Sequence, residues 1–560
     1  MLNRRDVLAS GMAALALGSA RTAEAKALSL STLITAPFVE VKTPSGKVRG
    51  GHERGAMAFK GIPFAGSVKG GNRFKAPPPL MPWAGVFDAT HLGPPTLQKP
   101  HSTYGENEPD YSEDCLVLNL WTPVSFEAGG RKRPVMVYLH GGGYSTGSAG
   151  STTQDGARLA ADYDVVVVAP NHRLGLLGFL YLGDALGEDY ATSGNQGMMD
   201  MIAALEWVKY HIEAFGGDPS NVTIFGESGG GAKVGTLLGM PAAKGLFHKA
   251  GIQSGAQLRR MPISAAIETR KRLMQALGIS DARQLLDIPA QTLLNLQWAA
   301  EGGAGPLMQP TADYVAPAQP EMMAISFSES TVAGHFGPVV DGSCLPVDPF
   351  DPVATSLCAE IPLLIGSNKT EATFFNMGRP DTFEMSEAQL HERLQMEFGS
   401  KAAQIAAVYR MARPLASSSE LYIAIATART MGNETVAFAA LKSQQPASVY
   451  LYRWDYEGNF PIPGTSCVLG AGHATDIGPT FNNWDEHGLH GNGVGVKQAA
   501  LNLSAIWTSF AHKGTPFVLG LPTWPRFDTR TRSTVLVDAT CQLVQDPDRR
   551  ERQMWERLDG

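Results

Sequence analysis

Residues 222–231 read VTIFGESGGG, and this stretch decides the fold. Its first four residues are apolar or β-branched, which predicts a buried strand. The glycines after them predict a sharp turn, and residues 231–234 (GAKV) are a plausible start of a helix. A serine in such a strand–turn–helix unit has a strained backbone, and only glycine fits two positions before and two positions after it. We therefore expect the Ser228 hydroxyl to be exposed at the amino end of a helix, where unpaired N–H groups favour negative charge.

Short apolar runs with helical patterns between them continue this unit on both sides. The runs rich in β-branched residues are residues 135–140, 165–170, 222–225, 361–365 and 448–454. Residues 198–215 have apolar side chains at helical spacing and join two of these runs into a β-α-β unit. The alternation predicts an α/β-hydrolase fold, with a central, mostly parallel sheet flanked by helices. We expect one catalytic domain over residues 28–560, with helical insertions at about 257–319 and 386–445 that cover the upper edge of the sheet.

An exposed serine needs a base and an oxyanion site before it can act as a nucleophile. Residues 140–144 (HGGGY) follow a predicted strand and have the form of the glycine-rich loop known in esterases and lipases. Successive glycines let the backbone turn its N–H groups toward one point. We therefore expect Gly142 and Gly143 to be oxyanion donors, with the N–H of Gly229 as the third. The alternative is a flexible turn, and His140 is interpreted as a structural hydrogen-bonding residue.

The triad of this fold follows the order serine, acid, histidine along the chain, so the acid and the base must come after Ser228. Glu371 follows a predicted strand, in a polar turn that closes on aromatic residues able to bury a carboxylate. The histidines beyond it are His391, His473, His487, His490 and His512. Small residues flank His473 and would let its ring approach the serine, whereas His391 and His512 have helical, charged surroundings typical of a surface. Position alone leaves the choice of base open.

Composition excludes several classes of function. The formal net charge is −7, without a basic stripe that could neutralise a phosphate backbone, so we expect no nucleic-acid partner. The five cysteines are widely spaced, with no pair or His/Cys cluster at metal-ligand spacing. We expect no zinc site and no disulfide framework, and an odd count leaves at least one free thiol.

The first residues are typical of an export signal. Arg4 and Arg5 precede a mildly apolar stretch at residues 7–20, and Ala23-Glu24-Ala25 then supplies a small-x-small cleavage site. The pattern predicts a twin-arginine signal peptide over residues 1–27, and hence a periplasmic or secreted bacterial protein. An N-terminal amphipathic helix or anchor is the alternative. We expect no membrane span in the mature chain, because no later segment is long and apolar enough.

Together these motifs resemble the type-B carboxylesterases, which include bacterial para-nitrobenzyl esterases and the animal cholinesterases. The resemblance covers nearly all of the expected mature chain. Its further motifs are residues 61–65 (GIPFA), 73–74 (RF), 82–83 (PW), 112–119 (SEDCLVLN), 171–175 (NHRLG), 194–197 (GNQG), 215–219 (FGGDP), 337–342 (GPVVDG) and 506–511 (IWTSFA). In that family the glutamate of a Lys-x-Glu turn and the histidine of a Gly-x-x-His-Ala turn complete the triad. The resemblance therefore assigns these roles to Glu371 and His473.

The chain departs from the family pattern at several positions. Thr96 stands where members often have a cysteine that pairs with the one at Cys115, so we expect Cys115 to be unpaired. Gly229 replaces a usual alanine, which keeps the N–H donor but loosens the backbone that holds it. His172 replaces a common tyrosine and is interpreted as a substitution without a role in the reaction. Glu227 is placed to contact a cationic alcohol group, as in cholinesterases, although nothing else marks an aromatic cage.

The sequence thus predicts a serine carboxylic ester hydrolase that acts through an acyl-enzyme on small to medium esters and requires no metal or organic cofactor. One alternative is a catalytically silent binding protein on the same fold, since function belongs to the site and not to the fold. Another is a lipase or an amidase, which shares the triad. The physiological ester and the oligomeric state stay open.

Overall fold

The computed structural model describes residues 38–98, 108–300 and 333–559. The signal peptide predicted over residues 1–27 lies outside the described residues, as does the part of the first predicted insertion from residue 301 to 319.

Thirteen strands of the described chain form one sheet, in the order β1-β2-β3-β5-β7-β6-β8-β9-β12-β13-β16-β17, with β4 beside β2. Neighbouring strands from β7 to β16 run parallel, and antiparallel strands extend the sheet at both ends. This is the mostly parallel sheet that the sequence predicts. The strands are β1 (Phe38–Thr43), β2 (Gly46–Glu53), β3 (Ala56–Pro63), β4 (Val86–Asp88), β5 (Val117–Pro123), β6 (Arg133–Leu139), β7 (Val166–Pro170), β8 (Gly217–Glu227), β9 (Lys249–Gln253), β12 (Leu363–Asn368), β13 (Val449–Trp454), β16 (Ser533–Val537) and β17 (Gln542–Gln545).

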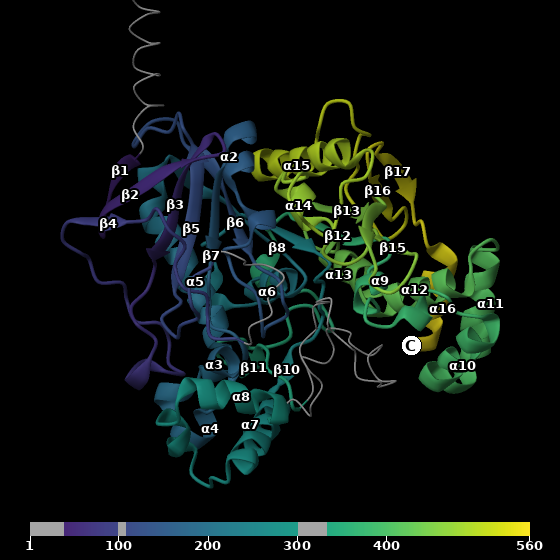
Figure 1. The fold of residues 1–560 in the computed structure, drawn as a ribbon, viewed down its shortest axis with the longest axis horizontal. Helices are drawn as coiled ribbons and strands as arrows, with labels where there is room; N and C mark the ends of the chain where they lie inside the picture. The colour runs from purple at the N-terminus through teal and green to yellow at the C-terminus, as the bar shows by residue number, and fades with distance from the viewer. Residues whose placement is uncertain (1–37, 99–107, 301–332, 560) are drawn as a thin grey trace, which may run out of the picture.

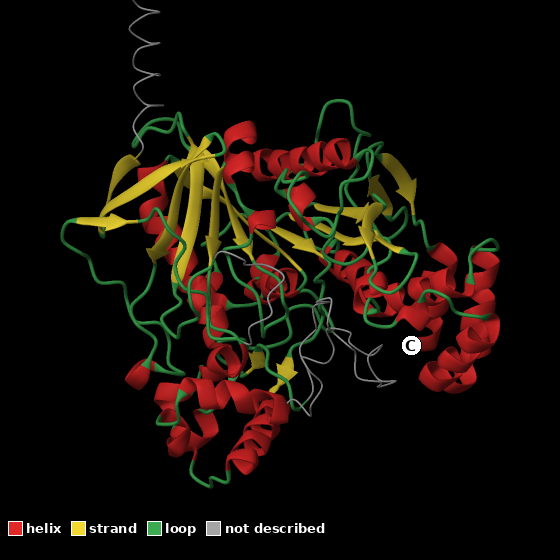
Figure 2. Cartoon of the chain, in the orientation of Figure 1, coloured by secondary structure: helices red, strands yellow, loops and turns green. Residues whose placement is uncertain are grey.

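Helices cover both faces of this sheet (Figures 1 and 2). One face packs against α5, α6 and α13, and the other packs against α2 and α15. The helices of the described chain are α2 (Ala157–Tyr163), α3 (Gly175–Phe179), α4 (Gly183–Leu186), α5 (Gln196–His211), α6 (Gly229–Leu237), α7 (Ile263–Leu277), α8 (Ala290–Ala300), α9 (Ala372–Phe375), α10 (Glu387–Phe398), α11 (Ala402–Ala412), α12 (Ser418–Thr427), α13 (Asn433–Lys442), α14 (Ile477–Thr480), α15 (Val496–Lys513) and α16 (Arg549–Asp559).

The strand β6 shows why these segments form a sheet that is buried on both faces. All seven of its residues are buried. Val135 and Val137 point into the core under α5 and α6, whereas Met136 and Tyr138 point into the core under α2 and α15. Side chains alternate between the two faces of a strand, so a strand covered on both faces is a continuous apolar run. The strands predicted from such runs, and the helix predicted at residues 198–215, are confirmed within a few residues.

The predicted insertions contain helices as expected in the described residues. The first range includes α7 and α8, and the second includes α10, α11, α12 and α13. Figure 1 shows α7 and α8 together below the sheet, and α10 and α11 at the lower right, beside the C-terminal α16. Helix α13 differs from the others because it packs directly on β12 and β13, on a face of the sheet. That both ranges are insertions within one catalytic domain stays a prediction.

Candidate active site

Ser228 lies in the turn between β8 and α6, near the middle of the sheet (Figure 1). Its backbone angles are φ 56° and ψ −127°, a conformation that costs an L residue about 1–3 kcal/mol. A Cβ on Gly226 would lie 2.6 Å from the carbonyl carbon of Gly230, and a Cβ on Gly230 would overlap the carbonyl oxygen of Leu139. The prediction that only glycine fits at these two positions is therefore confirmed.

The structure brings the predicted base and acid to this serine. Nε2 of His473 lies 2.8 Å from Oγ of Ser228, and Nδ1 of His473 lies 2.7 Å from Oε2 of Glu371. The side chains come from three distant parts of the chain, and each residue is at most 4% exposed. Because the Glu371 carboxylate accepts a hydrogen bond, it fixes the proton of the neutral imidazole on Nδ1. Nε2 is then left as the acceptor that faces the serine hydroxyl.

Two turns hold the acid and the base against each other. The N–H of Asn368, the last residue of β12, donates to Oε1 of Glu371 at 2.7 Å. The Asn368 side-chain amide donates to the carbonyl of Gly472 at 2.7 Å, in the turn that carries His473. The N–H of His473 in turn donates to the carbonyl of Glu371 at 3.3 Å. The carboxylate thus keeps its place through backbone bonds, as a rigid acid requires.

The remaining candidate histidines do not reach the serine. His391 and His487 are exposed, which confirms the surface position predicted for His391. His490 is buried and contacts the carbonyl of Trp484 at 3.2 Å. His512 is half-buried and contacts the carbonyl of Tyr163 at 3.0 Å, so it is less exposed than the sequence indicated. Its position on the last turn of a packed helix explains the difference.

The glycine-rich loop at residues 140–144 fixes its peptide groups through their carbonyls. Nδ1 of His140 contacts the carbonyl oxygen of Gly141 at 2.9 Å, which is the structural role predicted for this histidine. The carbonyl of Gly142 accepts from the N–H of Thr146 at 3.0 Å. In a planar trans peptide the C=O and the following N–H point in opposite directions. The N–H groups of Gly142 and Gly143 therefore point away from these anchors.

Gly229 contributes a third N–H by the same logic. The carbonyl of Ser228 accepts from the N–H of Ala232 at 3.1 Å, inside the first turn of α6, so the N–H of Gly229 in the same peptide points off the end of the helix. Turn and loop hydrogen bonds between backbone groups of the described residues use none of the N–H groups of Gly142, Gly143 and Gly229. All three are available to a developing oxyanion.

The two segments that carry these donors lie in close contact. A Cβ built on Gly229 would overlap the carbonyl group of Gly143. The expectation that glycine here mainly loosens the backbone is therefore incomplete, because its missing methyl group also gives the loop room to approach the start of α6.

A comparison with known families matches residues 36–555 to the carboxylesterase family model. The chain belongs to the carboxylesterase family. It is 35% identical over 523 residues to the para-nitrobenzyl esterase of Bacillus subtilis (strain 168), covering 92% of this chain and 97% of that relative. It is 30% identical over 530 residues to the phenmedipham hydrolase of Pseudarthrobacter oxydans, covering 92% and 98% of the two chains.

Solved structures give the same result for the fold. A carboxylesterase from Geobacillus stearothermophilus superposes with a TM-score of 0.76 at 35% identity, covering 92% of this chain and 99% of that one. The predicted α/β-hydrolase fold and the predicted resemblance to type-B carboxylesterases are both confirmed. This carboxylesterase is a carboxylic ester hydrolase, and a serine mechanism is general to its family.

A second carboxylate lies beside the base in this carboxylesterase. Oε1 of Glu227 lies 3.3 Å from Nε2 of His473, and both carboxylate oxygens of Glu227 are fully buried. Burial raises the pKa of the Glu227 carboxyl, although the neighbouring His473 opposes this. Burial disfavours the charged imidazole of His473, but Glu227 and Glu371 outweigh burial and raise the pKa of the ring above 6.5.

Asp476 is a supporting residue that the sequence analysis did not identify. It is fully buried, and its carboxylate accepts from the side-chain amide of Gln253 at 2.7 Å and from that of Asn368 at 3.2 Å. Burial and the nearby Glu371 raise the pKa of the Asp476 carboxyl to about 6. The signal was its place in the small-residue turn three positions after His473, where a buried polar group must be hydrogen-bonded.

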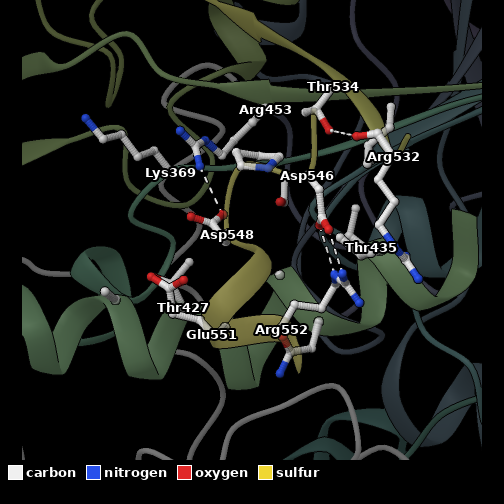
Figure 3. Close-up of a pocket in the computed structure, with 18 of the residues that line it drawn as sticks. Lys369, Thr427, Thr435, Arg453, Arg532, Thr534, Asp546, Asp548, Glu551 and Arg552 are labelled. Atoms are coloured by element: carbon white, nitrogen blue, oxygen red, sulfur yellow. Dashed lines mark hydrogen bonds and ion pairs between the residues drawn. The ribbon is translucent and has the colours of Figure 1, made fainter. Parts of the chain in front are cut away.

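A separate cavity of about 100 Å³ lies between α12, α13, α16 and the ends of β12 and β13. Figure 3 shows that charged side chains line it, and several of them pair with one another across its wall. Arg552 donates twice to Asp546, at 2.9 and 2.6 Å, and Arg453 donates to Asp548 at 3.1 Å. These pairs tie the C-terminal helix to the sheet. We assign no substrate to this cavity, because the triad side chains do not line it.

Other features of the described residues bear on the sequence predictions. All five cysteines are free thiols, including the buried Cys115. No group of three His, Cys, Asp or Glu side chains in the described part of the chain could hold a metal ion. No helix in these residues has the length and apolar character needed to cross a membrane.

Proposed function

We propose that Ser228, His473 and Glu371 are the catalytic triad of this carboxylic ester hydrolase. The observation that carries the proposal is the continuous relay of 2.8 Å from Ser228 to His473 and 2.7 Å from His473 to Glu371. We further propose that the N–H groups of Gly142 and Gly143, together with that of Gly229, form the oxyanion hole. The orientation of their peptides supports this assignment.

The first half of the reaction forms an acyl-enzyme. Oγ of Ser228 attacks the ester carbonyl carbon while its proton passes to Nε2 of His473, and the carbonyl oxygen becomes an oxyanion held by the three N–H groups. The intermediate collapses by breaking the bond to the alcohol oxygen, which takes the proton from His473. Glu371 stabilises the transient imidazolium and keeps the ring in one tautomer. In the second half, water replaces the alcohol and the carboxylic acid leaves.

We propose small to medium esters with an apolar or aromatic group as the substrate class. The rings of Phe374 and Phe375 lie with their centroids 5.7 and 4.8 Å from that of His473, and both residues are half-buried. They offer an apolar wall beside the reacting centre. The names of two relatives, a para-nitrobenzyl esterase and a phenmedipham hydrolase, support aromatic substrates. Rates on short-chain esters, long-chain esters and amides would separate this specificity from that of a lipase or an amidase.

Covalent labelling tests the triad assignment. A p-nitrophenyl phosphonate should inactivate the folded protein and add one phosphonyl group per chain, located on Ser228 by peptide mass mapping. The Ser228→Ala variant should fold with an unchanged melting temperature and take up no label. Absence of an adduct on Ser228 in the folded wild-type protein would overturn the assignment and favour a catalytically silent binding protein.

We also propose export through a twin-arginine signal. Arg4-Arg5, the apolar stretch and the Ala-x-Ala site support it. In a bacterial host, the full chain should appear in the periplasm or medium with an N-terminus near residue 28. Replacing both arginines by lysine should leave the uncut precursor in the cytoplasm. Correct processing of the double-lysine variant at an undiminished rate would argue against this route.

A further inference from the structure

Lys233 is a buried lysine that the hydrolytic mechanism does not use. It is the fifth residue of α6, the helix that begins directly after Ser228, and its exposed fraction is 0%. No ion pair among the described residues includes it. Burial alone lowers the pKa of its amine to about 7. Burying an isolated ammonium group carries a large free-energy penalty. A neutral amine with few hydrogen-bond partners carries a smaller penalty, but burial still destabilises the fold.

Among the described residues, the one hydrogen bond of this amine leads to the glycine-rich loop at residues 140–144, which we call the oxyanion loop. Nζ of Lys233 donates to the carbonyl oxygen of His140 at 2.9 Å. The aromatic ring of Tyr144, at the other end of the same loop, lies with its centroid 6.0 Å from Nζ. The lysine therefore joins the helix that carries the nucleophile to the loop that carries two of the proposed oxyanion donors.

This contact fixes the loop at the point where its peptide directions are set. Lys233 holds the carbonyl of His140, and the ring of His140 holds the carbonyl of Gly141 at 2.9 Å. Two successive peptide planes are thereby constrained, and the second of them contains the N–H of Gly142. Loss of the first anchor would free the peptide that precedes this N–H and so loosen its position, and oxyanion donors act only when they are fixed before the charge develops.

His172 packs against the same cluster. It is fully buried, its ring centroid lies 4.5 Å from that of His140, and neither ring nitrogen has a hydrogen-bond partner among the described residues. Because its imidazole makes no hydrogen bonds there, His172 contributes by packing, and it supports the position of the His140 ring. The substitution of tyrosine by His172 and the buried Lys233 therefore belong to one structural unit behind the loop.

We propose that Lys233 is a positioning residue, whose hydrogen bond to the His140 carbonyl orients the N–H donors of the oxyanion loop toward the ester carbonyl. Both the ammonium and the amine form carry an N–H that can donate, so the role does not depend on the charge. The inference rests on the proposed roles of Ser228 and Gly142, and it adds a residue that touches neither the substrate nor the triad.

The Lys233→Met variant tests the proposal, because methionine keeps the length of the side chain and removes the donor. We expect kcat on a p-nitrophenyl ester to fall about 10- to 100-fold with KM within twofold, since one fully lost oxyanion donor costs ~10²–10³ in kcat. The affinity for a trifluoromethyl ketone, which forms a tetrahedral adduct on the serine, should fall by a similar factor. The melting temperature should change little, because removing a buried amine offsets the loss of the donor to the His140 carbonyl.

Two further variants complete the experiment. Lys442→Met is a matched control. Lys442, the last residue of α13, is also fully buried, and its Nζ donates to the carbonyl of Ala359 at 3.4 Å. It should keep wild-type kcat. Lys233→Gln retains an N–H donor on a shorter side chain and should recover part of the lost kcat; it also carries the test if the methionine variant does not fold.

The outcomes separate the two proposals. Unchanged kcat and ketone affinity in Lys233→Met would overturn the positioning role, and so would a loss of kcat without a loss of ketone affinity. In both cases phosphonate labelling of Ser228 in the wild-type protein would still support the triad. Failure of that labelling would instead overturn the proposed function itself.

Discussion

Nε2 of His473 lies 3.3 Å from Oε1 of Glu227, on the side of the ring that faces the serine. The opposite ring nitrogen contacts Glu371 at 2.7 Å, so two buried carboxyl groups flank one imidazole. Glu371 orients the ring, whereas Glu227, whose own pKa burial raises to about 8, favours the charged imidazolium when it is ionised. This arrangement determines how the activity should depend on pH.

The first prediction concerns the acidic limb of the pH profile. The base must be neutral to accept the serine proton, and the flanking carboxyl groups raise the pKa of His473 above 6.5. Activity is therefore lost as pH falls through this raised pKa, so kcat/KM should begin to fall above pH 6.5. Because the ionised Glu227 carboxylate favours the imidazolium, Glu227→Gln should move the midpoint to lower pH. A profile that stays flat well below pH 6.5, or a midpoint that Glu227→Gln does not move, would contradict this account.

The second prediction concerns the acid of the triad. Glu371→Gln keeps the shape of the side chain but removes the charge that fixes the tautomer and stabilises the imidazolium. We expect kcat to fall by about 10²–10⁴-fold, by analogy with the measured effect of an acid-to-amide change in a serine protease triad. Glu397→Gln is a matched control, because Glu397 accepts a hydrogen bond from Tyr422 at 3.0 Å, away from the site. A loss of less than tenfold in Glu371→Gln would exclude Glu371 as the acid.

The third prediction concerns the contact between the oxyanion loop and α6. In Gly229→Ala the new methyl group would overlap the carbonyl of Gly143, although alanine is common at this position in the family. Either the loop or the helix start must shift, and we expect kcat to fall about 10- to 100-fold with a smaller change in KM. Gly71→Ala is the control, because a Cβ there meets nothing within 4 Å. Wild-type kcat in Gly229→Ala would show that the loop adapts to the methyl group without loss.

The fourth prediction concerns the C-terminal helix. Arg552 and Asp546 are 13% and 7% exposed and share two hydrogen bonds in the wall of the cavity in Figure 3. Arg552→Met leaves a largely buried carboxylate without these bonds and should lower the free energy of unfolding by about 1–3 kcal/mol, with kcat unchanged. Arg550→Met, at an exposed position of the same helix, is the control. Equal melting temperatures for all three proteins would show that the pair contributes nothing to stability.

The sequence predicts the parts of the site whose position follows from local chain geometry. The turn around Ser228 needs glycine at two fixed positions, and the loop after β6 needs successive glycines. Both motifs can therefore be recognised from the sequence alone. Strands β6, β7, β8, β12 and β13 are predictable as apolar runs because the sheet is buried on both faces, whereas β9 was not predicted. For Glu371 and His473, position left the choice open, and family motifs resolved it.

The sequence does not show contacts that arise only when distant segments meet. Glu227 reaches the base because the strained turn at Ser228 redirects the chain, and Asp476 meets Asn368 across two separate turns. The contact of Lys233 with the loop could not be predicted for another reason. Every residue of α6 is buried, so no apolar stripe marks which side of this helix faces the loop and which faces the core.

A crystal structure of the protein inactivated by a p-nitrophenyl phosphonate is the most direct test of the central claim, because it examines the nucleophile and the oxyanion donors together. The account predicts phosphorus bonded to Oγ of Ser228, with the phosphoryl oxygen about 2.7–3.1 Å from the nitrogens of Gly142, Gly143 and Gly229. Phosphorus on another side chain, or a phosphoryl oxygen turned away from all three nitrogens, would contradict it.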